Sequence, residues 1–215
     1  MIKKKLLAKT GLASVLGLSL LTAVPSVALA DFFSSDNPTY VGVGFGKTTI
    51  DTDVKFVDEK DTGKMVFIGK QFNKNIFIEA YYADLGKFSG SKDINKTATL
   101  DNGTQVLIKK VEATLKLKSF GIKANYMFEL DGDFKPYATI GFNKLTQDAT
   151  TKISIATAQE EGIINQDGGE DGTGIVLGAG VQKKFDGILV RGEYTRYKGK
   201  DGSVDLMWLG ASKQF

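Results

Sequence analysis

Hydrophobic and polar residues alternate along most of the chain after residue 30, and no stretch there repeats with the 3.6-residue period of an amphipathic helix. The alternation falls into eight segments of roughly ten residues, which is the length that a tilted β-strand needs to cross a bilayer. An even number of such strands suits a closed up-and-down barrel. The expected strands are residues 40–49, 63–72, 75–85, 113–129, 134–146, 173–185, 187–197 and 203–215.

Each expected strand has one apolar face and one face of small, polar or ionic residues. In the first, Val41, Val43 and Phe45 alternate with glycines. Alternation alone does not decide which face is outside, because a soluble barrel such as a lipocalin buries its apolar face and a membrane barrel turns it to lipid. Small and ionic residues suit a narrow, packed interior, and aromatic residues mark the strand ends, so the pattern favours the membrane barrel.

The connections between the expected strands differ greatly in length. Tight turns are expected at residues 73–75, 131–133 and 186–187, whereas residues 50–62, 86–112 and 147–172 form long connections. Short turns at one end and long loops at the other are typical of a bacterial outer-membrane barrel, with the long loops outside the cell. Within the second long connection, residues 97–108 contain an Asn-Gly turn and are expected to form a small hairpin.

Residues 1–30 are expected to be a cleaved signal peptide rather than part of the fold. Lys3, Lys4, Lys5 and Lys9 precede a short apolar run, and Ala28–Ala30 supply a small-residue cleavage site. Residues 31–215 then form a single outer-membrane β-barrel domain, exported through the periplasm. No Cys follows the apolar run, which excludes a lipid-anchored lipoprotein.

Charge and composition exclude several function classes. The chain has 28 basic and 25 acidic residues, but four of the basic ones belong to the expected signal peptide, so the remainder carries a net charge of about −1. Nucleic-acid binding is therefore not expected. The chain has no His, which removes the commonest general base and metal ligand. We expect no enzyme activity, no cofactor and no metal site.

Several motifs together resemble the OmpA-like/OmpX-like outer-membrane β-barrel family, which includes porin-family and opacity-type surface proteins. They are "YVGVGFG", "IEAYYADLG", "KPYATIGF", "GIVLGAGVQKKF", "ILVRGEYTRY" and "WLGASKQF". The resemblance implies a monomeric barrel in the outer membrane whose final Phe215 is the signal for the barrel-assembly machinery. Lys70, Lys183 and Lys213 stand where the family often has Tyr before the final Phe of descending strands.

Ionic residues on the polar faces are expected to meet inside the barrel. In so narrow a space unpaired charge is costly, so these groups are expected to pair with one another and form a satisfied polar core. A gated narrow pore through the same lumen is the alternative. The expected lumen network comprises Glu79, Lys123, Arg191, Glu193 and Lys184.

A second set of basic residues falls on the outward register just above the apolar band. Such a collar suits charge-assisted bonds to the phosphates of lipopolysaccharide, although rim charges also serve ordinary solvation. Both interpretations remain open. The collar comprises Lys47, Lys116, Lys118, Lys144 and Arg196.

Two further motifs are expected to be structural. "GFGKTT" at residues 44–49 lacks the first glycine of a phosphate-binding loop, and its glycines alternate within a strand. The acidic residues 160–171 lack calcium-hand spacing and are expected to form a solvated loop. We therefore expect a structural or adhesive surface protein that acts through its loops, whose ligand would be a host or matrix molecule. A pore for ions or small solutes is the alternative.

Overall fold

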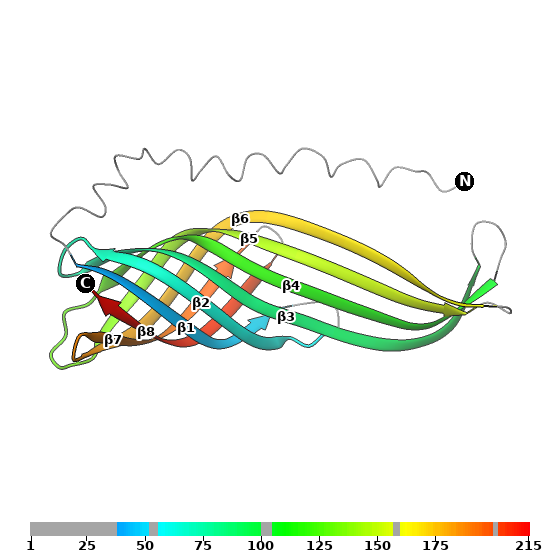
Figure 1. Ribbon diagram of the computed structural model, residues 1–215, viewed down its shortest axis with the longest axis horizontal. Coiled ribbons are helices and arrows are strands. Elements are labelled where there is room, and N and C mark those ends of the chain that lie inside the picture. Colours follow the sequence, from blue (N-terminus) through cyan, green and yellow to red (C-terminus); the bar gives the residue numbers. More distant parts are fainter. Residues whose placement is uncertain (1–37, 52–55, 100–104, 157–159, 200–201) are drawn as a thin grey trace. The chain divides into compact units, whose positions relative to one another are not determined.

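The computed structural model describes residues 38–51, 56–99, 105–156, 160–199 and 202–215, all within one compact unit that spans residues 37–215. The expected signal peptide lies outside the described residues. Eight antiparallel strands close into a barrel in which β1 pairs with both β2 and β8 (Figure 1). The strands are β1 (Thr39–Ile50), β2 (Lys60–Gln71), β3 (Ile76–Thr99), β4 (Gln105–Met127), β5 (Lys135–Ala156), β6 (Glu161–Phe185), β7 (Ile188–Lys198) and β8 (Ser203–Gln214).

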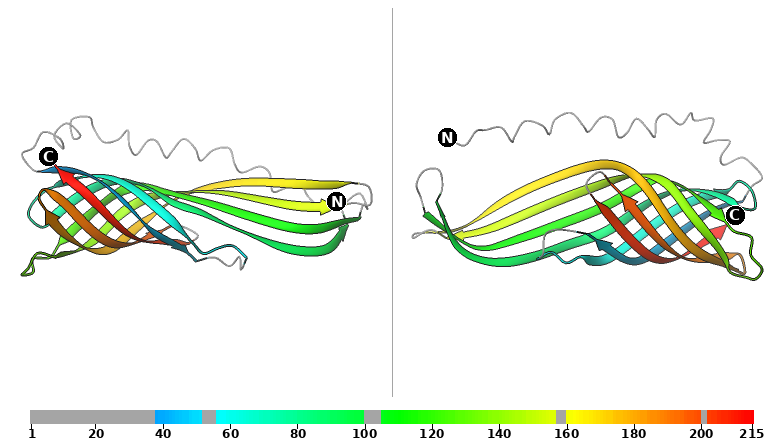
Figure 2. Two further views of the ribbon diagram at one scale, coloured as in Figure 1. Left: turned by 60° about the horizontal axis from the view of Figure 1, so that its bottom comes forward. Right: turned by 180° about the vertical axis from the view of Figure 1, so that it is seen from behind.

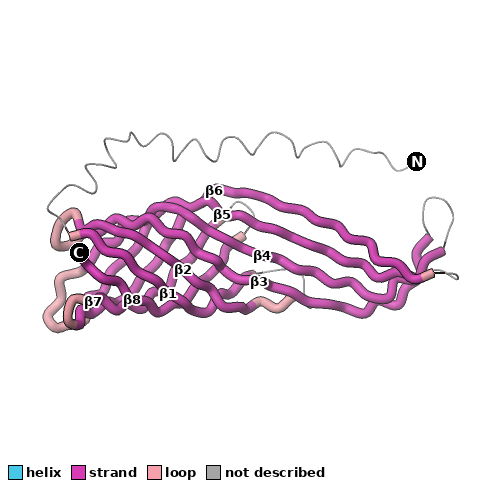
Figure 3. The backbone as a smooth tube through the Cα atoms, in the orientation of Figure 1, coloured by secondary structure: helices cyan, strands magenta, loops and turns pink. Residues whose placement is uncertain are grey.

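The all-β, eight-stranded expectation is confirmed, and turns and short loops join the strands (Figure 3). Among the described residues, no helix is long and apolar enough to cross a membrane. We call the end of the barrel with the tight turns its lower end. In the lower part of the barrel the apolar side chains point outward: Val43 is 56% exposed and Phe142 75%. Lys123 and Trp208 point inward and are buried. This arrangement is the reverse of a soluble barrel and requires lipid around the outer face.

Aromatic residues gather at the end of the barrel that has the tight turns. Phe72, Phe128, Phe185 and Phe215 lie at the ends of β2, β4, β6 and β8, and all four are exposed. The Phe215 N–H donates to the Thr39 carbonyl at 2.9 Å, and the Thr39 N–H donates back at 3.3 Å. The backbone of Phe215 thus takes part in closing the barrel between β8 and β1.

The long connections differ from expectation in two of three cases. Residues 86–112 and 147–172 were expected to be loops, but most of them continue β3, β4, β5 and β6, which have 24, 23, 22 and 25 residues against 11 or 12 in the other strands. These four strands extend as one sheet past the ends of the others (Figures 1 and 2). We call this part of the sheet the extension. The strands of the expected hairpin form its tip, where Lys96–Thr99 pair with Gln105–Ile108, and the Asn-Gly turn lies outside the described residues.

The extension exists because strand alternation continues above the barrel with its polarity reversed. On β4 the outward side chains change from Phe120 and Ile122 to Lys118 and Lys116. The inward side chains of β4 change from Lys123 to an apolar series, which is Leu117, Leu115, Ala113 and Val111. The membrane needs an apolar outer face, and water above it needs a polar one, so the same strands satisfy both solvents.

The β1–β2 connection supports the base of the extension. Val57 forms an isolated antiparallel bridge with Gly90 of β3, and the Asp58 N–H donates to the Ser89 carbonyl at 3.2 Å. At the opposite edge, β7 pairs with β6 as far as Ile175. Within the described residues, β6 has no strand partner on that side beyond this point, so its upper half is an edge strand.

The glycines of β1 face the lumen because two large side chains fill the space beside them. A Cβ at Gly42 would lie 2.2 Å from the Phe67 ring, and one at Gly44 would lie 2.4 Å from the Trp208 indole. The "GFGKTT" motif is therefore part of a packed barrel wall, as expected, and opens no helix.

Adding a methyl group at Gly44 tests this packing. We expect Gly44→Ala to destabilise the folded barrel by about 1–3 kcal/mol through overpacking. In a Trp208→Phe background the same change should be less destabilising, because the smaller ring leaves room. Urea titration in lipid vesicles, read by the heat-modifiable gel shift, measures both.

Gly162→Ala is the matched control, since a Cβ there would lie 3.7 Å from Ile155, an ordinary contact. If Gly44→Ala lowered the stability equally in the parent and in the Trp208→Phe background, the close packing of Gly44 against Trp208 would be contradicted.

Candidate functional site

The lumen contains a group of charged side chains contributed by three strands. Glu79 on β3, Lys123 on β4, and Arg191 and Glu193 on β7 occupy inward register positions, and each is at most 3% exposed. The structure brings four of the five expected lumen residues together. Their two positive and two negative charges balance, which suits burial in a narrow barrel.

Glu79 on β3 forms an ion pair with Arg191 on β7, across the barrel. The Arg191 Nη1 donates to Glu79 Oε1 at 2.6 Å, and the Tyr40 hydroxyl donates to the same oxygen at 2.7 Å. The guanidinium also lies 4.3 Å from the centroid of the Phe67 ring. Such a contact between a cation and an aromatic face is favourable where water is excluded.

Glu193 is the second hub of the network. The Lys123 ammonium donates to its two carboxylate oxygens at 2.8 and 3.1 Å. The Tyr137 and Thr195 hydroxyls each donate to Glu193 at 2.8 Å. Lys123 also lies 3.4 Å from Glu79 Oε2, so the two ion pairs form one connected network.

Sequence reasoning missed the neutral members of this network. Tyr40, Tyr137, Thr195 and Trp208 all point inward, and the Trp208 Nε1–H donates to the Thr195 hydroxyl at 3.2 Å. Parity along each strand would have placed them in the lumen, because each lies an even number of residues from an inward neighbour on its own strand. Their pairing depends on the register across the barrel, which parity does not give.

An apolar cluster fills the lumen above the ionic network. It is contributed by several strands and includes Leu85, Phe88, Leu117, Tyr197 and Leu206, each at most 3% exposed. The barrel interior is therefore layered, with the ion pairs below and an apolar layer at the mouth that faces the extension. Interiors of eight-stranded barrels are just wide enough to be filled in this way.

Lys184 was expected to join the lumen network, and this expectation is wrong. The residue has the inward register of Gln182, but it is next to last in β6 and lies at the open end of the barrel. It is exposed, and its ammonium donates to Gln214 at 2.9 Å. The alternation correctly assigns Lys184 to the inward face of β6. The residue lies at the end of that strand, however, where the barrel has no closed interior.

The five collar residues all take the outward register, but they differ in their partners. Arg196 forms a bidentate pair with Asp205 at 2.7 Å, and Lys144 contacts Asp171 at 2.7 Å. The remaining three, Lys47, Lys116 and Lys118, form no ion pair within the described part of the chain and are exposed. Lys116 lies directly across from Lys87 on β3, an unfavourable pairing of like charges, and from Asp148 on β5. Lys118 lies directly across from Asp84 on β3.

The outer face of the extension is covered by interleaved charges. Lys110 and Glu112 on β4 are 2.6 Å apart, and the hydrogen bond from Lys110 lowers the pKa of the Glu112 carboxyl. A contact from Lys109 likewise lowers the pKa of Glu161. A carboxyl group whose pKa is lowered by folding stabilises the folded protein at pH values above the group's ordinary pKa. This stabilisation is lost as the pH falls through the lowered pKa.

The acidic segment 160–171 is mostly strand rather than the expected loop. Its side chains alternate between the two faces of β6, so Asp167 and Asp171 point outward and Glu170 points to the other side. Among the described residues, no group of three or more acidic side chains is arranged to hold a metal ion.

Removal of one charge tests the lumen network. We expect Glu79→Gln to destabilise the barrel by about 3–5 kcal/mol, because Arg191 is left buried without its carboxylate. Urea unfolding from lipid vesicles, followed by the fluorescence of Trp208, the single tryptophan, measures the loss. Glu112→Gln on the exposed outer face is the control and should change stability by at most about 0.5 kcal/mol. Equal midpoints for the two variants would contradict a buried, coupled network.

The barrel and its contents can be compared with known proteins. The crystal structure of Ail, the attachment invasion locus protein of Yersinia pestis, is similar with a TM-score of 0.52 and 14% identity, covering 84% of this chain and 100% of that one. Neisserial surface protein A (TM-score 0.48, 13% identity, 82% and 97% covered) and OprG of Pseudomonas aeruginosa (0.49, 12%, 82% and 95%) are also similar. No curated protein matches the sequence. Residues 14–215 match the family described as outer membrane protein beta-barrel domain, and the chain therefore belongs to this family of the cell outer membrane.

Proposed function

We propose that this outer-membrane protein has a structural and adhesive role at the cell surface, exercised through the extension of β3–β6. The observation that carries the proposal is that four strands continue well beyond the membrane barrel as an ordered sheet. A rigid barrel that presents a large surface outside the cell is a common arrangement for binding. Ail, whose fold is similar, is named for attachment, which supports the same class of role.

Conduction through the lumen is the alternative function, and the packing of the lumen does not favour it. Trp208, Lys123 and Arg191 are each at most 2% exposed, and an apolar cluster lies above them. An ion would have to separate two ion pairs and then cross an apolar layer. The proposal therefore places function on the outside of the barrel.

Phe215 is proposed as the recognition signal for the barrel-assembly machinery. Its side chain is 76% exposed at the end of β8, while its backbone pairs with Thr39 of β1. An accessible ring on the strand that closes the barrel is available to a partner before closure occurs.

The collar is proposed to bind lipopolysaccharide phosphates through the lysines that form no ion pair with described residues. We expect replacement of Lys47, Lys116 and Lys118 by Gln to weaken lipopolysaccharide binding about tenfold or more, since charge-assisted bonds to phosphate are lost. Titration of lipopolysaccharide into the protein in nanodiscs measures the affinity.

The control for this prediction replaces Lys144 and Arg196, whose charges already contact Asp171 and Asp205. This double variant should weaken lipopolysaccharide binding much less than the triple variant does. If the triple variant binds as well as the parent, the collar serves solvation only.

Shortening the extension tests the adhesive role. Residues 91–112 and 152–165 are each replaced by Asn-Gly, which joins the cross-strand pairs Gly90–Ala113 and Thr151–Gln166 by two-residue turns. We expect the shortened protein to fold, as the gel shift reports, and vesicles that carry it to be retained at least about tenfold less on a surface coated with extracellular-matrix extract.

The outer-face variant Glu112→Gln in the full-length protein is the control and should be retained like the parent. Undiminished retention of the shortened protein would contradict the proposal.

A further inference from the structure

The inner face of the extension is apolar along its centre and continues the lumen-facing side of the barrel. Its two central strands, β4 and β5, carry most of the apolar side chains, and the outer face of the same strands carries the charges described above. The inner-face side chains of these strands above the barrel mouth include Val111, Ile108, Ile153 and Ile155. These four side chains are half-buried, and Ile164 of β6 on the same face is 46% exposed. An apolar face that is open to water outside the membrane favours a partner.

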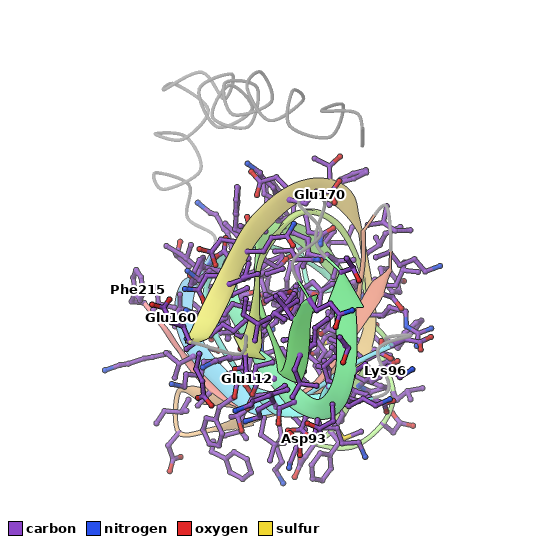
Figure 4. The ribbon with its side chains drawn as sticks, turned by 90° about the vertical axis from the view of Figure 1, so that its right-hand side faces the viewer. Asp93, Lys96, Glu112, Glu160, Glu170 and Phe215 are labelled. Atoms are coloured by element: carbon purple, nitrogen blue, oxygen red, sulfur yellow. The ribbon has the colours of Figure 1, made fainter. Side chains whose placement is uncertain are left out.

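The two flanking strands add charges at the margins of this face. Lys92 and Lys96 of β3 pair with Val111 and Ile108 and so share their side of the sheet, as does Glu170 of β6. Figure 4 views the extension from its tip and labels Lys96 and Glu170, which lie on opposite edges of the four strands. An apolar centre with a polar rim is the usual composition of a protein interface.

Side-chain size is distributed unevenly along this face. On β5 the upper positions hold Ile153 and Ile155, whereas the lower positions hold Ala149 and Thr151. On β6 the upper Ile164 is followed below by Gly168. On β5 and β6 a second sheet with the same sequence fits this face when it runs in the opposite direction, because its large upper side chains then lie over small lower ones. On β4 the lower positions hold the large Leu115 and Leu117, which pack into the apolar cluster at the barrel mouth.

The area of the face is consistent with a weak pair. Leu117 at the lower end and Val106 at the tip are each only 3% exposed, so they add no free surface. With strands about 4.8 Å apart and about 3.3 Å of length per residue, four strands from the level of Leu115 to that of Ile108 cover on the order of 450 Å². Two such faces together bury roughly 900 Å², which is the size of a weak, transient contact.

The position of the barrel decides how two copies can meet. The inner face lies on the same side of the sheet as the barrel's own lumen. A second copy in the same membrane, facing this sheet at the usual spacing of about 10 Å, would place its barrel in the same volume. A copy in an opposing membrane avoids this clash, because its extension points the other way.

We propose that the inner face of the extension binds the same face of a second copy in an opposing membrane, so that the protein joins cell surfaces by self-recognition. The two sheets pack antiparallel, with Ile155 of each copy over Ala149 of the other. This inference rests on the proposed adhesive function and names its partner.

The experiment mixes two populations of lipid vesicles, labelled with different dyes, that carry the folded protein. Parent vesicles should cluster with one another and not with bare vesicles. Ile153→Lys should reduce clustering more than about tenfold, because a charge is buried in the interface. Ser154→Lys, on the outer face of the same strand, should cluster like the parent. The gel shift confirms that each variant is folded.

An exchange of side-chain size tests the orientation. Vesicles with Ala149→Ile should not cluster with one another, because the larger side chain introduced at this position then meets Ile155 of the other copy. Vesicles with Ile155→Ala should cluster weakly. A mixture of the two should cluster, since each bulky side chain then faces a small one.

Three results would overturn the inference: clustering of parent vesicles with bare vesicles, equal behaviour of Ile153→Lys and Ser154→Lys, or no clustering in the mixture. Vesicles that fail to cluster but are still retained on matrix extract would overturn self-recognition and leave the proposed function intact.

Discussion

The need to satisfy every backbone hydrogen bond in lipid determines this structure. In hydrocarbon an unpaired N–H or C=O is costly, so a sheet that crosses the membrane must close on itself. The pairing of β1 with β8, down to the reciprocal bonds between Thr39 and Phe215, meets this requirement. Above the membrane water satisfies the backbone, so the upper halves of β3 and β6 can remain edges. The change from a closed barrel to an open sheet follows from the change of solvent.

The same change of solvent reverses the polarity of the strand faces. Within the membrane, lipid takes up the outward apolar side chains, and polar groups must satisfy one another inside. Glu79 and Glu193 therefore each gather a cation and at least one hydroxyl donor. Above the membrane, the central strands turn their charges outward to water and their apolar side chains inward. The apolar layer at the mouth of the barrel lies where these two regimes meet, and it separates the ion pairs from the extension.

Sequence alternation was sufficient to predict the barrel, its eight strands and the lumen position of Glu79, Lys123, Arg191 and Glu193. It did not give the pairs among them, because Arg191 meets Glu79 only through the register of the closed sheet. Lys184 shows the limit of parity, which fixes a face and not a depth. An apolar outward face marks only the part of a strand that lies in lipid, so this pattern does not predict the extension. Residues 115–118 alternate Leu and Lys in the opposite phase, and this reversal was the available signal.

The two layers of the interior also explain how one chain can keep a rigid barrel and a separate binding surface. The charge-balanced network and the packed Gly44–Trp208 contact involve residues of the barrel, and the ion pairs of Lys109 and Lys110 stay within the extension. A change at the tip of β4 or β5 therefore leaves the barrel contacts in place. Edge strands in water usually invite unwanted pairing, and charges on an extended sheet reduce it. On the central strands the charges lie on the outer face alone, so the inner face is the side of the extension that remains suited to a partner.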